Sequence, residues 1–522
     1  MGKIYMVFLA ASLLVGCGGD ANRQTQLQVA EAEAEHVATG KSAGSQDDLP
    51  DPLQMGDDQI KPESGLSVDP KTDTEMRADI EDTQAEATSE QKKEPESKTD
   101  EERVILGDEQ FDVYLPLLAG KRVALFSNHT GIVGDQVADN GNGLADSQKV
   151  DAQKVDAQQE ILPFGISADG EQIQYGEHIL DALISRDVDV TVIFSPEHGF
   201  RQMADAGEAV GDSVDEKSGV PIVSLYNGGH SSLKEHMAQF DTLLIDMQDV
   251  GLRYYTYYLT MYDLMDACAA KGKEVILLDR PNPNGFYVDG PVLREEFSSG
   301  VGKLPLPIVH GMTWGELSRM INGEGWLSAG KDACSLTVIP CKNYTHQMKT
   351  SLICNPSPNI KDMRAVYLYA STCFFENTVV SVGRGTEFPF EAYASPYLET
   401  VDGYDFCFTP KSMSGAKNPP FEGKVCYGKD LRQKPLKQIW DEQIHLEYLM
   451  DAYRDIHAAY PDLAFFGTPD KQGRYWLDKL CGTDRVRLMI EEGRSAAEIR
   501  ESWQSDIEAF KKRRRPYLLY EE

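Results

Sequence analysis

Five short apolar runs constrain the fold of this chain more than any other feature of its sequence. Each run is continuous and not alternating, which is typical of strands buried on both faces of a sheet. Helix-like stretches lie between them, at residues 177–186, 231–239 and 257–271. The alternation of strand and helix predicts an α/β fold with a doubly wound parallel sheet. The five predicted strands are residues 121–127, 188–194, 221–226, 241–247 and 273–279.

Four of these strands end directly in polar segments. The segments follow the first, second, fourth and fifth strands, so they meet at the carboxyl edge of a parallel sheet. In open sheets of this kind, ligands bind in the crevice beyond that edge. The sequence therefore predicts one site, formed by residues 128–131, 196–201, 248–255 and 280–285.

The second strand ends on an acid and an imidazole, Glu197 and His198. Pro196 fixes the turn before them and Gly199 lets the chain turn away after them, so the strand aims the Glu197 carboxyl. Apolar neighbours favour the neutral form of a carboxyl group, which suits a general acid. In the alternative interpretation, Glu197 and His198 cap the next segment or pair with Arg201.

The sequence favours a sugar over a nucleotide as the ligand. No G-x-G-x-x-G motif occurs, and the nearest phosphate-loop match, residues 325–331, is followed by Asp332 where Ser or Thr is needed. Tyrosines crowd residues 251–263 and offer aromatic faces to a sugar ring. In the alternative interpretation, at least half of them pack between helix and sheet. Arg253 beside them suits a carboxylate, so a sugar that carries an acid satisfies both features.

The start of the chain is typical of an export signal. An apolar run over residues 4–15, too short to span a bilayer as a helix, leads into Leu14-Val15-Gly16-Cys17. These four residues resemble a bacterial lipobox, which implies cleavage before Cys17 and acylation of its thiol. We therefore expect an exported protein, anchored by lipid to the cell envelope at the periplasmic face or the outer membrane. An ordinary signal peptide with a chance cysteine is the alternative.

Residues 18–103 contain no Phe, Trp, Tyr or Cys, so they bury too little apolar surface to offset their ordering entropy. We expect a disordered acidic tether, a spacer in preference to a partner-binding segment. It carries about −14 of the net charge of −33, which argues against nucleic acid as a partner. A tandem QKVDA repeat predicts a surface insertion at about 135–175. We expect a catalytic domain over 104–354 and a second domain over 355–522.

Cysteine and histidine spacing indicates no metal site. Eight cysteines follow Cys17, and any disulfides are expected first in the cluster from Cys334 to Cys373. No C-x-x-C pair occurs, and the histidines near the predicted site share no ligand spacing, so we expect neither a metal nor a cofactor. These histidines are His129, His198, His230 and His310.

Seven motifs occur in order along the chain: SPEHGFR, DMQDVGLRYYTY, LDRPNPNG, VDGPVL, HGMTWGEL, NPSPNI and VGRGTEFPFE. Together they resemble the exo-β-N-acetylmuramidases of the NamZ type, formerly described as a domain of unknown function. The resemblance covers about residues 104–522. It implies a Rossmann-like N-terminal domain, a smaller α+β C-terminal domain and an active site in the cleft between them. It also implies release of N-acetylmuramic acid from non-reducing ends of peptidoglycan fragments, in cell-wall turnover and recycling.

The resemblance also implies a role for Glu197, and we infer the roles of the other residues from the motifs in which they lie. The family's proposed catalytic glutamate corresponds to Glu197, which would protonate the glycosidic oxygen. Asp249 is the first candidate for the second group and Glu387 the next, while the substrate's own acetamido group could act instead. Arg253 or Arg384 would receive the lactyl carboxylate of muramic acid. Further expected substrate contacts are Asn128, His129, His198, Arg201, Tyr255, Asn282 and His310.

Two other classes of protein fit parts of the pattern. A non-catalytic muropeptide-binding lipoprotein would share the fold and the arginines, but its function would tolerate Glu197→Gln. An esterase or amidase would need a nucleophile beside a base, and Ser195 lacks the G-x-S-x-G elbow. Neither class accounts for all seven motifs.

Overall fold

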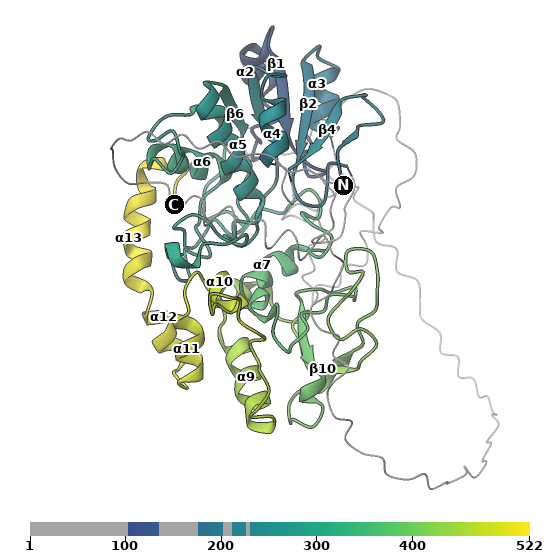
Figure 1. Ribbon diagram of the computed structural model, residues 1–522, viewed down its shortest axis with the longest axis vertical. Helices are drawn as coiled ribbons and strands as arrows, with labels where there is room; N and C mark the ends of the chain where they lie inside the picture. Colours follow the sequence, from purple (N-terminus) through teal and green to yellow (C-terminus); the bar gives the residue numbers. More distant parts are fainter. Residues whose placement is uncertain (1–102, 135–175, 202–210, 226–229) are drawn as a thin grey trace, which may run out of the picture. The chain divides into compact units, whose positions relative to one another are not determined.

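The computed structural model describes residues 103–134, 176–201, 211–225 and 230–522 (Figure 1). The predicted signal peptide, the tether up to residue 102 and the insertion lie outside the described residues. All five predicted strands are present, in one sheet of seven strands. They are β1 (Arg122–Phe126), β2 (Asp189–Ser195), β4 (Pro221–Ser224), β5 (Thr242–Ile245) and β6 (Glu274–Leu278).

Two further strands were not predicted from the sequence. The short β3 (Ser213–Val214) pairs antiparallel with β4 at one edge, and β7 (Ser335–Ile339) pairs parallel with β6 at the other. Every other neighbouring pair in the sheet is parallel. The fold-class prediction is therefore confirmed for this half of the chain.

The strand order creates a switch point between β1 and β5. The sheet runs β3-β4-β2-β1-β5-β6-β7, so the chain builds outward from β1 to β4 and then returns to build outward from β5 to β7. Apart from the β3 edge, this is the strand order of a Rossmann fold. Connections leave the carboxyl ends of β1 and β5 in opposite directions, which opens a crevice there.

Both faces of the sheet are buried, as the continuous apolar runs predicted. In β1, Ala124 and Phe126 belong to the core cluster that includes α5 (Tyr257–Lys271). Val123 and Leu125 belong to the cluster that includes α3 (Ile179–Ile184), because successive strand side chains point to opposite faces.

The predicted helices of this half are also present. α3 and α5 occupy two of the predicted stretches, and α4 (His230–His236) occupies the third. α6 (Trp314–Gly323) begins with a capping box, in which the Thr313 side chain accepts from Glu316 N and the Glu316 side chain accepts from Thr313 N. α2 (Phe111–Leu118), before β1, was not predicted.

The C-terminal half contains a small antiparallel sheet and a set of helices, which confirms the expected α+β character. The sheet has the order β8-β10-β9, with β8 (Ala392–Ser395), β9 (Phe406–Phe408) and β10 (Cys426–Asp430). The helices are α7 (Met363–Thr372), α8 (Leu436–Glu442), α9 (Glu447–Ala459), α10 (Trp476–Cys481), α11 (Arg485–Glu491), α12 (Ala496–Glu501) and α13 (Gln504–Arg514). The 3-10 turns are η2 (Glu295–Phe297), η3 (Cys373–Phe375), η4 (Pro396–Leu398) and η5 (Arg515–Tyr517).

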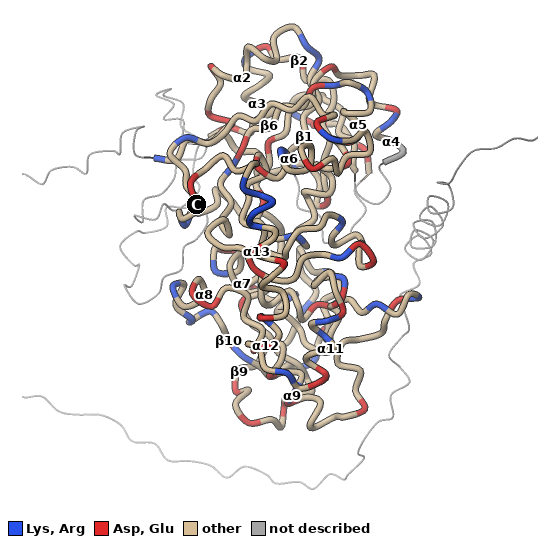
Figure 2. The backbone as a smooth tube through the Cα atoms, turned by 90° about the vertical axis from the view of Figure 1, so that its left-hand side faces the viewer, with Lys and Arg blue, Asp and Glu red and all other residues tan. Residues whose placement is uncertain are grey.

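The last helix leads the chain back to the first half. α13 ends in a run of Lys and Arg residues, blue in Figure 2, whose charges complement the helix dipole. The turn η5 follows and packs against α6. Residues at the end of the chain therefore contact the doubly wound sheet domain.

The eight cysteines after Cys17 are all free thiols in the structure. No disulfide is therefore formed within the cluster from Cys334 to Cys373, where any disulfides were expected first. None of the helices in the described residues combines the length and apolar character needed to cross a membrane.

Candidate active site

The exits of β1 and β5 are joined at the switch point. The Thr130 hydroxyl accepts a hydrogen bond from the backbone N–H of Gln248 at 3.0 Å and donates to Asn128 Oδ1 at 2.6 Å. Asn128 is fully buried, and its backbone carbonyl lies 2.8 Å from His178 Nε2. These bonds fix the loop after β1, so Asn128 shapes the wall of the crevice.

Glu197 follows β2 on a sharply turned segment. His198 has φ 73° and Gly199 has φ 85°, so two successive residues adopt the left-handed conformation and turn the chain away from the sheet. A histidine in that region carries backbone strain, and such strain clusters at functional sites. Between Ser195 and Phe200, Glu197 alone is not fully buried. The turn thus presents its carboxyl to solvent at the edge of the sheet.

Tyr257, the first residue of α5, lies near both candidate carboxyls. Its ring centroid is 6.4 Å from that of His198, and its hydroxyl donates to the Pro356 carbonyl at 3.3 Å. Burial raises the pKa of Tyr257 well above its usual value, and the nearby charges of Glu197 and Asp249 raise it further. The hydroxyl therefore stays neutral and can donate a hydrogen bond within the site.

Sequence reasoning counted Tyr257 only as one member of a tyrosine cluster. The signal that distinguishes it is its place at the first turn of the helix that follows the Asp249 loop. This position holds the ring beside His198 at the carboxyl edge of the sheet, although Tyr257 belongs to the same buried cluster as Tyr258 and Tyr262.

Asp249 follows β5 and is nearly buried, with 9% of its surface exposed. Burial raises its pKa to about 7, and the hydrogen bond from Gly251 N to Oδ2, at 2.7 Å, opposes that shift. A carboxyl with a pKa near 7 changes protonation state in the range where a general acid or base is most effective. Its other oxygen, Oδ1, is buried without a hydrogen-bond partner among the described residues.

A loop from the C-terminal half lies against these strand exits. His129 Nε2 lies 2.8 Å from the carbonyl oxygen of Asn355, and the Tyr255 hydroxyl donates to the Pro356 carbonyl at 2.7 Å. Both carbonyls belong to the NPSPNI motif. The structure therefore brings together Asn128, His129, Glu197, His198, Asp249 and Tyr255 around the switch point, with Tyr257 and residues 355–356 added to the predicted set.

Arg253 lies away from this group. It has no exposed surface, and Nη2 donates to the backbone carbonyls of Leu480 and Cys481, each at 3.0 Å. Those carbonyls end α10, where a cation complements the helix dipole. Burial lowers the pKa of Arg253. Because its guanidinium is covered on all sides, it cannot receive a ligand carboxylate without a rearrangement.

Arg201 is also engaged in structural contacts. Its Nε lies 2.6 Å from Asp215 Oδ1 and its Nη2 lies 2.8 Å from Asp181 Oδ1. These two ion pairs fix the segment that follows the Glu197 turn. They also lower the pKa of both aspartates against the opposing effect of burial.

Asn282 and His310 form a layer behind Asp249. Asn282 Nδ2 donates to the Met312 carbonyl at 2.8 Å, and a Cβ on Gly251 would lie 2.0 Å from Asn282 Oδ1. Gly251, at φ 77°, thus allows the Asp249 loop to approach Asn282 closely. Burial lowers the pKa of His310 to about 3, so its imidazole is neutral and Nδ1 accepts from Met312 N at 3.2 Å. Both side chains support the loops from within.

Arg384 and Glu387 occupy different environments. Arg384 donates to Glu376 Oε1 through Nε at 3.0 Å and Nη2 at 2.6 Å, and 22% of its side chain is exposed. The positive charge of Arg384 opposes the rise that burial causes in the pKa of Tyr369. The ring centroid of Tyr369 lies 6.4 Å from that of Tyr255. Glu387 is 80% exposed and pairs with Lys361 at 2.8 Å. Its carboxyl is thus solvated and held by a lysine.

A cavity of about 810 Å³ lies elsewhere, between the loop 285–289 and the helices α12 and α13. Of the residues predicted to form the site, only Gly285 lines it, and none of the candidate catalytic or substrate-binding side chains does. We place the candidate site at the switch point because the strand exits converge there and carry the two carboxyls. Among the described residues, no group of three or more His, Cys, Asp or Glu side chains is arranged to hold a metal ion.

A pair of carboxyl groups flanked by tyrosines, at the switch point of a doubly wound sheet, is suited to the hydrolysis of glycosidic bonds. Two sequence-family models match this chain. The model for the N-terminal part of the exo-β-N-acetylmuramidase NamZ matches residues 166–364, and the model for its C-terminal part matches residues 367–520. The chain therefore belongs to the NamZ exo-β-N-acetylmuramidase family.

Individual relatives agree with this assignment. The peptidoglycan β-N-acetylmuramidase NamZ of Bacillus subtilis (strain 168) is 34% identical over 351 residues, which cover 64% of this chain and 80% of that protein. A crystal structure of a DUF1343 family protein from Bacteroides fragilis NCTC 9343 is 45% identical with a TM-score of 0.64, covering 80% of this chain and 99% of the other. A second such protein from the same strain, at 24% identity and a TM-score of 0.62 with the same coverage, shares the fold.

Proposed function

We propose that the protein is an exo-acting glycoside hydrolase that releases N-acetylmuramic acid from the non-reducing ends of peptidoglycan fragments. The observation that carries the proposal is the match to both halves of the NamZ family across residues 166–520, with Glu197 in the sharply turned exit of β2. The substrate class follows from the relative of known activity, a peptidoglycan β-N-acetylmuramidase.

Glu197 acts as the general acid. Its carboxyl donates a proton to the glycosidic oxygen as the bond from that oxygen to C1 of the muramic acid residue breaks, and the aglycone leaves as an alcohol. Its half-exposed position supports this role, because a proton donor must touch both the substrate and the solvent that restores its proton.

Asp249 acts as the second group. Its burial suits the electrostatic stabilisation of a positively charged transition state, because interactions between charges are stronger where water is excluded. The neutral Tyr257 hydroxyl lies near both Glu197 and Asp249 and can orient either the substrate or the attacking water. In the substrate-assisted variant, the acetamido group attacks C1 and Asp249 stabilises the charge that develops on it.

Arg384 receives the lactyl carboxylate that distinguishes muramic acid from glucosamine. Part of its guanidinium is exposed, and its contact with Glu376 uses Nε and Nη2, which leaves Nη1 for a ligand. The buried Arg253 has no such surface.

The protein also carries a lipid anchor on Cys17, in our proposal, and acts at the bacterial cell envelope. The lipobox-like Leu14-Val15-Gly16-Cys17 sequence supports this placement. Cys17→Ser should move the protein from the membrane fraction to the soluble fraction and abolish incorporation of a labelled fatty acid. Retention of both labelling and membrane association in the variant would contradict the anchor.

The proposed activity is tested with a chromogenic β-N-acetylmuramide beside the matching β-N-acetylglucosaminide. We expect turnover of the muramide only, and a loss of at least about 100-fold in Glu197→Gln, because general acid catalysis contributes that much. A folded wild-type protein that binds muropeptides and cleaves neither sugar would instead indicate the binding lipoprotein. Circular dichroism of the variant checks that its fold is intact.

A further inference from the structure

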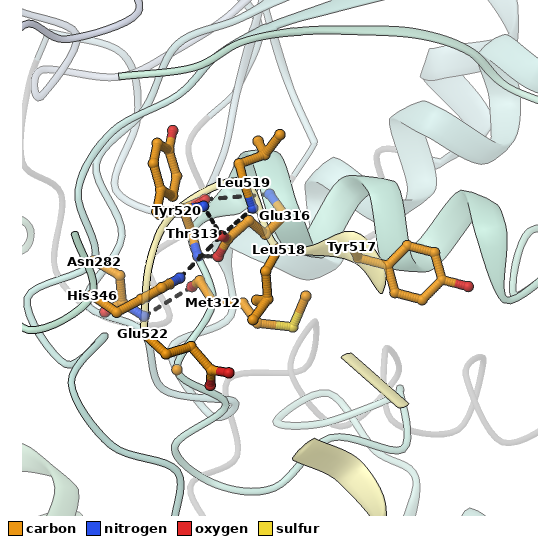
Figure 3. A network of polar contacts seen from close by, with 12 residues as sticks. Asn282, Met312, Thr313, Glu316, His346, Tyr517, Leu518, Leu519, Tyr520 and Glu522 are labelled. Atoms are coloured by element: carbon orange, nitrogen blue, oxygen red, sulfur yellow. Dashed lines mark hydrogen bonds and ion pairs between the residues drawn. The ribbon is translucent and has the colours of Figure 1, made fainter. Parts of the chain in front are cut away.

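The last residues of the chain bind to buried carboxyl groups beside α6 (Figure 3). Glu316 Oε1 accepts hydrogen bonds from the backbone N–H groups of Leu519 at 2.8 Å and Tyr520 at 3.3 Å, and it lies 3.0 Å from His346 Nε2. Glu316 Oε2 accepts from Thr313 N at 3.0 Å. One buried carboxyl thus joins the C-terminal segment to the first turn of α6.

A second carboxyl makes the same connection. The Tyr520 hydroxyl donates to Asp279 Oδ2 at 2.6 Å, and the Thr313 hydroxyl donates to the same oxygen at 2.7 Å. Asp279 Oδ1 accepts from Gly315 N at 2.8 Å. Asp279 follows β6 and has no exposed surface. The C-terminal segment and the first turn of α6 therefore share both of their anchors, Asp279 and Glu316.

Trp314 is the residue that these anchors hold. It lies between Thr313 and Gly315, and its ring stacks on Phe126 at the end of β1, with centroids 6.2 Å apart and planes 12° apart. Its indole N–H favours the charged form of the Asp249 carboxyl, against the stronger effect of burial. Trp314 therefore connects the anchored turn with the candidate catalytic carboxyl.

A small cavity borders both groups. Asp249 and Trp314 line the same space of about 10 Å³, together with Asn282 and Thr313. The Trp314 indole N–H therefore lies close enough to the Asp249 carboxyl to favour its charged form.

We propose that the C-terminal segment 517–522 is a positioning element of the active site: it fixes the first turn of α6 so that the Trp314 indole, which borders the same small cavity as Asp249, orients the Asp249 carboxyl. The proposal rests on the proposed function, since it assumes that Asp249 acts in the reaction. Trp314 and Tyr520 touch no substrate in this scheme and act only through Asp249.

The ionisable groups around Asp249 include the other candidate carboxyl, Glu197, together with three tyrosines and one arginine. Tyr255, Tyr257 and Tyr258 lie on the α5 side, and burial raises the pKa of each above its usual value, so they stay neutral. Arg280 lines the small cavity, but its charge is paired with Asp108 at 2.7 Å and Asp246 at 2.6 Å. Removal of the Trp314 N–H therefore takes away an uncharged donor and leaves the charged groups around Asp249 in place.

The test uses two variants and a matched control in the full-length protein. Trp314→Phe keeps the ring stack on Phe126 and removes the N–H. Tyr520→Phe removes the hydroxyl that binds Asp279. Tyr517→Phe is the matched control, because it removes a hydroxyl from the same segment. That hydroxyl donates to Glu324 Oε1 at 2.8 Å. In Figure 3 the Tyr517 side chain points away from both anchors.

The readout is the pKa of Asp249, measured by a carbon-13 NMR titration of the aspartate carboxyls, in which the Asp249→Asn spectrum identifies the signal. We expect Trp314→Phe to raise this pKa by roughly one pH unit, because a donor to the charged form is lost. Tyr520→Phe should raise it by a smaller amount, since Asp279 then holds the first turn of α6 more weakly. Tyr517→Phe should leave it unchanged.

In the pH profile of kcat/KM on the muramide, the apparent pKa that belongs to Asp249 should move to higher pH in Trp314→Phe and Tyr520→Phe. The proposal is overturned if Tyr520→Phe leaves the Asp249 pKa at the wild-type value, or if Tyr517→Phe shifts it equally. If the wild type cleaves no muramide, the proposed function fails, and the NMR titration still decides whether the segment positions Asp249.

Discussion

The Nε2 atom of His129 lies 2.8 Å from the backbone carbonyl oxygen of Asn355. A carbonyl only accepts, so the imidazole carries its proton on Nε2, and Nδ1 is buried without a partner among the described residues. Burial lowers the pKa of His129, so the ring is neutral at pH 7. Since His129 follows β1 and Asn355 begins the NPSPNI motif, this bond connects the strand edge with the C-terminal half of the chain.

Acidification should weaken this connection. A histidine whose pKa is lowered in the folded protein stabilises the fold fully above its unfolded pKa of about 6.5 and loses that contribution as the pH falls. Protonation would place a second N–H at Nδ1, where no acceptor lies. Denaturant unfolding at pH 7 and pH 5 should therefore show a larger loss of stability for the wild type than for His129→Gln, whose amide can still donate to Asn355. Equal losses would show that His129 is not responsible.

Asp249 and Glu387 should differ sharply as second catalytic groups. Asp249 is nearly buried beside Tyr257, whereas Glu387 is 80% exposed and paired with Lys361. We expect Asp249→Asn to lower kcat on the muramide by about 100-fold or more, the range found when electrostatic stabilisation of a transition state is removed. Glu387→Gln should retain most of the activity. The opposite ranking in steady-state kinetics would transfer the role to Glu387.

Asp249→Asn should also change the pH dependence of stability, with a sign opposite to that of His129. The folded pKa of Asp249, about 7, lies above its unfolded value of about 3.9. Its protonated form stabilises the fold below pH 4, and this contribution is lost as the pH rises to about 7, by up to about 4 kcal/mol. The variant carries no such ionisation, so its stability relative to the wild type should increase between pH 4 and pH 7. Thermal unfolding across this range measures the difference.

The predicted strands differ in burial from β7, one of the two strands of the large sheet that were missed. The run in β5 is buried at every position, and its continuous apolar sequence identified it. In β7 the pattern is only partly buried, because this strand lies at the edge of the sheet beside β6. Its sequence, Ser335–Ile339, therefore lacks the continuous run that marks a central strand. The same reasoning placed Glu197 correctly at a strand exit, since that placement depends only on local sequence.

Contacts between distant parts of the chain were beyond reach of the sequence pattern. The motif around Arg253 indicated proximity to the site, but a loop residue can point either way, and the α10 carbonyls that bind it lie more than 200 positions later. The hydrogen bond from Tyr520 to Asp279 likewise joins residues more than 200 positions apart in the sequence. Pattern reasoning detects which residues lie on an element and not which distant backbone groups they meet.

The buried triad beneath the site should dominate the stability of the sheet edge. Arg280 pairs with Asp108 at 2.7 Å and with Asp246 at 2.6 Å, and all three side chains are at most 2% exposed. Arg280→Met leaves two buried carboxyls without a cation and should cost about 3–5 kcal/mol in the free energy of unfolding. Arg122→Met is the matched control, because Arg122 pairs with Asp241 at a solvated surface where an ion pair contributes little. Similar losses of unfolding free energy in the two variants would mean that the buried triad stabilises the protein no more than the surface ion pair does.

Selection of muramic acid should depend on Arg384 and not on Arg253. Both were candidates for the lactyl carboxylate, but Arg253 is fully buried against the end of α10, whereas 22% of the Arg384 side chain is exposed. We expect Arg384→Ala to raise KM for the muramide by about 10-fold or more, because a charge-assisted hydrogen bond to the substrate is lost. The variant should also prefer the muramide over the glucosaminide by a smaller factor than the wild type does. Arg253→Met should lower the unfolding temperature but keep that preference. If Arg253→Met abolishes the preference in a protein that remains folded, Arg253 must reach the substrate through a rearrangement that exposes its guanidinium.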